Sequence, residues 1–91
     1  MKNAFWILRR SEDSCYCPLD VNFNHKIFLD KVYGSSSEWI VAYYIDENFK
    51  YEYKEVFSTN NLSEARRKAL SLVKEYVNNK AIYWNSIAKL F

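Results

Sequence analysis

Glycine and proline are nearly absent from this 91-residue chain, which contains only Gly34 and Pro18. Their scarcity excludes collagen-like sequences and flexible Gly/Pro-rich linkers, and a single glycine excludes a glycine-rich phosphate-binding loop. No apolar run approaches the ~20 residues of a membrane span. The first ten residues also lack the ~7–15 apolar residues of a secretory signal. We therefore expect one cytoplasmic domain over residues 1–91, with no membrane contact.

Cysteine and histidine are also few, which limits the chemistry available. Cys15 and Cys17 are separated by one residue, so they cannot link distant segments, and the redox motif needs two intervening residues. With His25 they supply three ligands at unsuitable spacing for a tetrahedral zinc ion, which needs four. Asp13 or Asp20 would have to be the fourth. We predict two inert or mildly reactive thiols and no metal site.

Catalytic groups are equally scarce. His25 is the only candidate for a histidine general base. It lies in a segment of alternating polar and apolar residues, where an ordinary side chain beside a sheet is the simpler interpretation. The acidic pairs Glu12-Asp13 and Asp46-Glu47 fall in predicted loops as solvated turn residues. We predict no catalytic residue, no cofactor and no enzymatic activity.

Aromatic residues, by contrast, are abundant: three Trp, eight Tyr and six Phe make up 19% of the chain. This content excludes intrinsic disorder, which goes with few aromatics and a high net charge. The formal net charge of +2 is too small for a long-range field that draws the chain to nucleic acid or acidic lipid. The chain is therefore predicted to form a globular core rich in rings.

The first third of the chain predicts short strands. Residues 4–8 form a continuous apolar run, which indicates a central strand covered on both faces. Residues 11–20 predict a loop. Apolar and polar residues alternate in residues 21–29, as in a half-buried strand. A short helix over residues 27–33, ended by Gly34, is the alternative.

Residues 39–57 predict a β-hairpin, because Trp, Val and Tyr favour strands and Asp46-Glu47-Asn48 favours a turn. A three-residue loop separates apolar from charged residues better than a two-residue loop, so we expect that register. The expected cross-strand pairs are Ile45–Phe49, Tyr43–Tyr51 and Val41–Tyr53. The opposite face then carries Ile40, Ala42 and Tyr44 beside Lys50, Glu52 and Lys54.

Residues 61–79 predict an amphipathic helix. Asn61 is a good N-cap, and Glu64 three positions later completes a variant of the capping box. The apolar stripe consists of Leu62, Ala65, Ala69, Leu72, Val73 and Tyr76. A break at Asn78-Asn79 is expected, after which residues 81–91 form a short second helix or continue the first beyond a kink.

These elements predict an α+β fold with a small antiparallel sheet of three to four strands. One amphipathic helix packs on one sheet face, and a short C-terminal helix follows. The face expected under the amphipathic helix carries Trp39, Val41, Tyr43 and Ile45.

The sequence favours a non-catalytic protein-binding module. Tyr and Trp are enriched at binding hot spots, so the face opposite the helix is the candidate surface, unless the C-terminal helix covers it. The residues expected to bind the partner are Ile40, Tyr44, Lys50, Glu52 and Lys54. In size and composition the chain is similar to small inhibitors and accessory proteins of phages and mobile elements. Such proteins block a host macromolecule, for example a CRISPR-like defence complex.

Nucleic-acid binding is the alternative function. Basic side chains near a helix N-terminus oppose the macrodipole, which indicates a partner for them, and phosphate contacts with aromatic stacking are typical of single-strand binders. The residues expected to contact nucleic acid are Arg66, Arg67, Lys68 and Lys74. With either function, the chain is expected to be a monomer or a homodimer formed through an open sheet edge.

Overall fold

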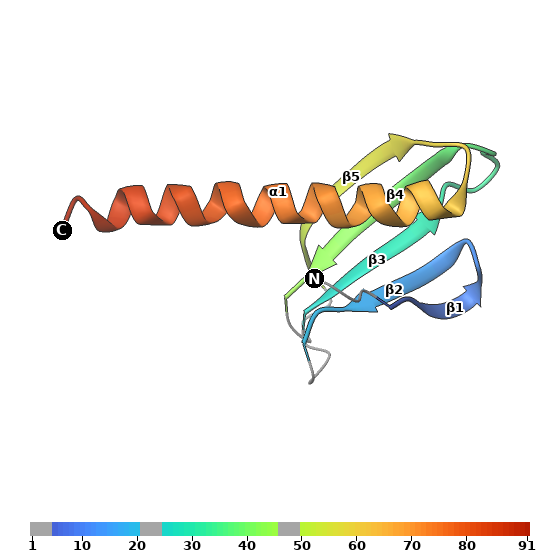
Figure 1. Ribbon diagram of the computed structural model, residues 1–91, viewed down its shortest axis with the longest axis horizontal. Coiled ribbons are helices and arrows are strands. Elements are labelled where there is room, and N and C mark those ends of the chain that lie inside the picture. The colour runs from blue at the N-terminus through green and yellow to red at the C-terminus, as the bar shows by residue number, and fades with distance from the viewer. Residues whose placement is uncertain (1–4, 21–24, 46–49) are drawn as a thin grey trace.

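The computed structural model describes residues 5–20, 25–45 and 50–91, which form a five-stranded antiparallel sheet and one long helix (Figure 1). Each strand pairs with the next one in the sequence, in the order β1-β2-β3-β4-β5. The elements are β1 (Ile7–Ser11), β2 (Ser14–Pro18), β3 (Lys26–Lys31), β4 (Glu38–Tyr44), β5 (Tyr51–Ser58) and α1 (Leu62–Ala88). The predicted α+β class is therefore confirmed.

The predicted count of three to four strands is wrong, because β2 forms where a loop was expected. Cys15 pairs with Leu29 and Cys17 pairs with Ile27 across the β2–β3 ladder. Both thiols point into the core. Cysteine therefore occupies the inward positions of β2, where strands usually carry larger apolar residues. Pro18 ends the strand, a position where its missing N–H is tolerated.

The predicted central strand over residues 4–8 is also wrong. β1 begins at Ile7 and lies at the edge of the sheet, and Leu8 is 54% exposed. Residue 4 lies outside the described residues. The strand continues through Arg9 and Arg10, whose charges suit an edge that faces water.

The segment after β2 is a strand, as its alternation indicates, and the alternative helix over residues 27–33 is wrong. The part of the predicted strand in residues 21–24 lies outside the described residues. Gly34 follows β3 and has a φ of 81°, a backbone conformation that residues with a Cβ rarely adopt. Its position in the sequence therefore reflects the turn into β4 and not the end of a helix.

The β4–β5 register differs from the predicted one. Tyr43 pairs with Tyr53 and Val41 with Glu55, so the predicted pairs Tyr43–Tyr51 and Val41–Tyr53 are wrong. The third predicted pair and the turn residues fall outside the described residues. An irregularity beside Tyr43 makes room for one extra residue on β5, after which Tyr44 pairs with Tyr51.

α1 packs on one face of the sheet, as predicted. Its small residues Ala65 and Ala69 and its Val73 are buried, which lets the helix backbone approach the strands closely. The sheet side of this core includes Cys15, Cys17, Ile27, Leu29, Trp39, Val41, Tyr43 and Phe57. Ile45, predicted for this face, lies beyond β4 and is exposed.

The helix begins where expected and ends later. The Asn61 side chain accepts a hydrogen bond from the Glu64 backbone N–H at 2.7 Å, which confirms the N-cap. Asn78 and Asn79 lie inside α1, so the predicted break and the predicted separate C-terminal helix are wrong. The first helix instead continues to Ala88, which was the alternative prediction. The second half of α1 extends well beyond the sheet (Figure 1).

Candidate functional site

The sheet face opposite α1, here called the open face, carries a row of aromatic rings that crosses four strands. Tyr16 of β2 lies 5.6 Å from Phe28 of β3, measured between ring centroids. Phe28 lies 5.0 Å from Tyr44 of β4, and Tyr44 lies 6.4 Å from Tyr51 of β5. The last two contacts are edge-to-face, at 80° and 85°. Cross-strand aromatic contacts of this kind stabilise a sheet.

Cationic side chains border this row. The guanidinium of Arg9 lies 4.8 Å above the Phe28 ring, and the ammonium of Lys54 lies 5.3 Å from the centre of the Tyr51 ring. Arg9 also pairs with Asp30 at 3.3 Å. The open face is therefore aromatic at its centre, with the Arg9–Asp30 ion pair toward β1 and the Lys54 ammonium on β5.

Three of the predicted partner-binding residues lie together on the open face. Ile40 pairs with Val56, which is 54% exposed, and Tyr44 belongs to the aromatic row. Lys54 lies beside Tyr51. Because α1 covers the other face of the sheet, no described helix covers these residues (Figure 1).

The other two predicted residues lie elsewhere. Lys50 is exposed and precedes β5. Glu52 was expected on the open face, but its carboxylate contacts Tyr76 and Lys80 of α1, so that expectation is wrong. The extra residue at the start of β5 turns Glu52 toward the helix, which the simple alternation could not anticipate.

The sequence reasoning missed Tyr16, Phe28, Tyr51 and Arg9 as members of the surface. Their proximity depends on β2 being a strand and on the strand order. A signal was present in Ser14–Pro18, where Cys15 and Cys17 alternate with Tyr16 in the period-two manner of a strand.

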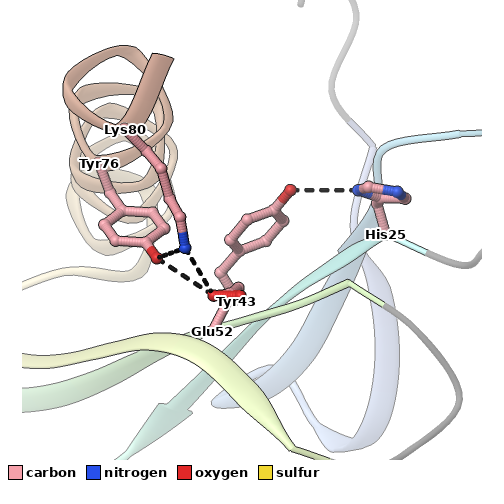
Figure 2. A network of polar contacts seen from close by, with 5 residues as sticks. All are labelled: His25, Tyr43, Glu52, Tyr76 and Lys80. Carbon is pink, nitrogen blue, oxygen red and sulfur yellow. Dashed lines mark hydrogen bonds and ion pairs between the residues drawn. The ribbon is translucent and has the colours of Figure 1, made fainter. Parts of the chain in front are cut away.

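A polar network joins α1 to the sheet on the covered face (Figure 2). The Tyr76 hydroxyl donates to a Glu52 carboxylate oxygen at 3.2 Å. The Lys80 ammonium lies 3.2 Å from that oxygen and 3.2 Å from the Tyr76 hydroxyl. Hydrogen bonds to Tyr76 and Glu52 raise the pKa of Lys80. The network fastens the helix at the point where it leaves the sheet.

His25, the histidine considered as a general base, lies near the same network. Its Nδ1 is 3.1 Å from the hydroxyl of Tyr43 (Figure 2). Burial raises the pKa of Tyr43, so this hydroxyl stays protonated in neutral solution. The hydrogen bond between these two side chains connects the start of β3 to the buried side of β4. A structural role therefore accounts for His25.

Cys15 and Cys17 are buried side by side in the core with free thiols. Burial raises the pKa of each thiol, and the nearby charge of Arg66 only partly opposes this at Cys15. The protonated thiol is a poor nucleophile and a poor metal ligand. Among the described residues, no three His, Cys, Asp or Glu side chains form a group that could hold a metal ion.

The predicted nucleic-acid residues point in different directions from α1. Arg66 lies above the Trp6 ring, whereas Lys68 lies above the Phe57 ring. Arg67 pairs with Glu64 on the helix surface, and Lys74 borders a groove beside α1. The structure does not bring these four side chains together.

Comparison with protein-family models, curated proteins and solved structures finds no match to this chain. In the part of the chain that the structure describes, no helix combines the length and the apolar character needed to cross a membrane. The function is therefore inferred from the open face and the helix alone.

Proposed function

We propose that this chain is a non-catalytic module that binds a partner protein through the open face. The observation that carries the proposal is the aromatic row of Tyr16, Phe28, Tyr44 and Tyr51, which crosses four strands on a face that α1 leaves uncovered. Aromatic residues and arginine are enriched among the residues that dominate the energetics of protein interfaces, and the aromatic side chains bury a large area with little loss of conformational freedom.

The arrangement of the rings favours a protein over single-stranded nucleic acid. Base stacking needs free ring faces, but Arg9 lies above Phe28, and the Phe28–Tyr44 and Tyr44–Tyr51 contacts are edge-to-face. The aliphatic pair Ile40–Val56 extends the row with surface that suits apolar side chains. The partner surface that fits is apolar at its centre, with carboxylates toward Lys54.

Binding of this kind acts by occupying a surface of the partner. It suits an inhibitor or accessory protein that blocks a host macromolecule, the class that the size and composition of the chain favour. No group on the open face has to form or break a bond for such a role.

The experiment compares variants in affinity capture from the native host, with and without nuclease. The double variant Ile40→Ala/Tyr44→Ala removes the centre of the open face, and Tyr33→Ala is the matched control. Tyr33 is a fully exposed aromatic residue in the turn after β3. We expect the double variant to lose the captured protein and the control to keep it.

Circular dichroism and urea unfolding establish that both variants keep the fold. If the folded double variant captures the protein as well as the parent does, the open face is not the binding surface. Capture that disappears after nuclease treatment would instead support the nucleic-acid alternative.

A further inference from the structure

The second half of α1 extends beyond the sheet (Figure 1). Several of its apolar side chains are exposed to solvent. Residues 77–91, here called the overhang, consist of a helical part up to Ala88, about 18 Å long at 1.5 Å per residue, and a short non-helical end. The exposed large side chains of the overhang include Val77, Tyr83, Trp84, Leu90 and Phe91, and Trp84 is 56% exposed. A helical segment of this length is marginal in water without tertiary packing, so the overhang needs a surface to pack on.

The spacing of residues in the overhang is that of a helix–helix seam. Val77, Ala81, Trp84, Ala88 and Phe91 follow one another at intervals of four, three, four and three residues. This spacing places Val77, Ala81, Trp84 and Ala88 on one side of α1, and Phe91 follows just beyond the end of the helix. Large and small side chains alternate along the seam, which suits a partner helix with the same alternation in the opposite direction.

A groove runs beside the preceding turns of α1. Its volume is about 490 Å³, and it lies between the helix and the end of the sheet. Its lining is largely aliphatic, with Lys74 at the border: Leu19, Ile27, Leu70, Ser71, Val73, Lys74, Val77 and Asn78. The groove shares Val77 with the seam, so the apolar surfaces of groove and overhang are continuous.

We propose that two copies of this chain associate through α1, with the helices antiparallel and the overhang of each copy seated in the groove of the other. A two-fold axis at the level of Asn79 sets the register. Ala81 then lies opposite Val77 of the second copy, and Ala88 lies opposite Leu70 of the second copy. Each contact places a small residue against a large one, and the symmetry repeats both.

The same register places Trp84 opposite Lys74 of the second copy. The indole then covers the lysine stem, and the ammonium can lie against its ring face. Tyr83 and Ile87 project from the sheet-facing side of the helix, so they lie over Leu19 and Ile27 of the second copy. Two sides of the overhang therefore contact the groove of the second copy: Trp84 lies on one side, and Tyr83 and Ile87 lie on the other.

The surface available is large enough for a stable dimer. At ~200 Å² for a whole aromatic side chain, Tyr83, Trp84 and Phe91 together leave about 430 Å² exposed on each copy. If the second copy covers them, these side chains of the two overhangs (about 860 Å²) and a similar area of groove wall would exceed the ~1,200 Å² at which specific interfaces begin. The open face lies on the other side of the sheet and stays accessible in this dimer.

Sedimentation equilibrium of the full chain over a concentration series tests the dimer. Trp84→Ala is the main variant, and Ile82→Ala is its control. Ile82 is 64% exposed, but it lies about 200° around the helix from Trp84 and outside the seam. We expect the parent and Ile82→Ala to dimerise. Trp84→Ala should weaken dimerisation at least thirtyfold, because symmetry removes the side chain twice.

Disulfide cross-linking tests the register. Val77→Cys and Ala81→Cys chains are oxidised separately and as a mixture, and the mixture should yield the most cross-linked dimer. The native thiols are buried and do not compete. A parent that stays monomeric at millimolar concentration overturns the proposal. So does a dimer that Trp84→Ala and Ile82→Ala weaken equally, or one in which the mixture gives no excess cross-link.

Discussion

Tyr53 of β5 and Tyr76 of α1 stack face to face, with ring centroids 4.9 Å apart and planes inclined by 20°. Glu52, the residue before Tyr53, accepts a hydrogen bond from the Tyr76 hydroxyl. The irregular register at the start of β5 therefore allows two successive residues to contact the helix. Glu52 and Tyr53 both face Tyr76 of α1. Strand register and helix position depend on one another at this point.

Substitution of Tyr76 separates the two contributions. Tyr76→Leu loses the ring stack and the hydroxyl, and we expect the free energy of unfolding to fall by about 1–3 kcal/mol. Tyr76→Phe keeps the stack and should cost about 1 kcal/mol or less. Urea unfolding measures both. Equal losses in the two variants would mean that the hydroxyl, and not the stack, holds the helix.

The N-cap gives a second prediction. Asn61→Ala removes the acceptor for the Glu64 N–H, and we expect it to destabilise the chain by about 1 kcal/mol. Asn61→Asp keeps an acceptor oxygen and should retain most of the stability. Thermal unfolding followed by circular dichroism compares the two variants. A larger effect of Asp than of Ala would show that the cap bond is not the stabilising contact.

Cys15 and Cys17 should be inert in the folded chain. Both side chains are fully buried, and burial raises the pKa of each thiol. Titration with a chromogenic disulfide reagent at pH 8 should detect almost no thiol in buffer. In denaturant it should detect two per chain. Rapid reaction of either thiol in buffer would show that β2 opens easily from the sheet.

Stability should decline in alkaline solution. The pKa values of Cys15, Cys17, Tyr43 and Lys80 are raised in the folded chain, so the folded state holds these protons to higher pH than the unfolded state does. Their contribution is complete below the unfolded thiol pKa of about 9. It is lost as the pH rises through the folded values, because the unfolded state then binds fewer protons.

Urea midpoints at pH 7, 9 and 10 measure this decline. The double variant Cys15→Ala/Cys17→Ala removes the two groups whose pKa is lowest in the unfolded chain, so its first loss should begin at higher pH than that of the parent. An unchanged alkaline profile in that variant would assign the decline to Tyr43, Tyr53 and Lys80, whose pKa values are also raised in the folded chain.

The sequence predicts those parts of the fold that local periodicity controls. The start of α1 follows from Asn61 and Glu64, and its buried face follows from the spacing of Ala65, Ala69 and Val73. β2 was missed because cysteine occupies its inward positions. The β5 register was missed because one extra residue leaves no trace in the composition of a strand.

The same distinction applies to the candidate surface. Ile40 and Tyr44 lie on one strand, so alternation alone places them on a common face. Tyr16 and Phe28 join them only through the order of the strands, which is a property of the whole sheet. The continuation of α1 was only one of two alternatives because the Asn78-Asn79 pair resembles a helix end, although α1 continues through it.

The order of the strands has a consequence for how the chain folds. Because every strand of the described sheet pairs with its neighbour in sequence, each pairing closes only a short loop and loses little chain entropy. Folding rates rise as contacts become more local. The sheet can therefore assemble hairpin by hairpin from either end, and no pairing has to wait for a distant segment to arrive.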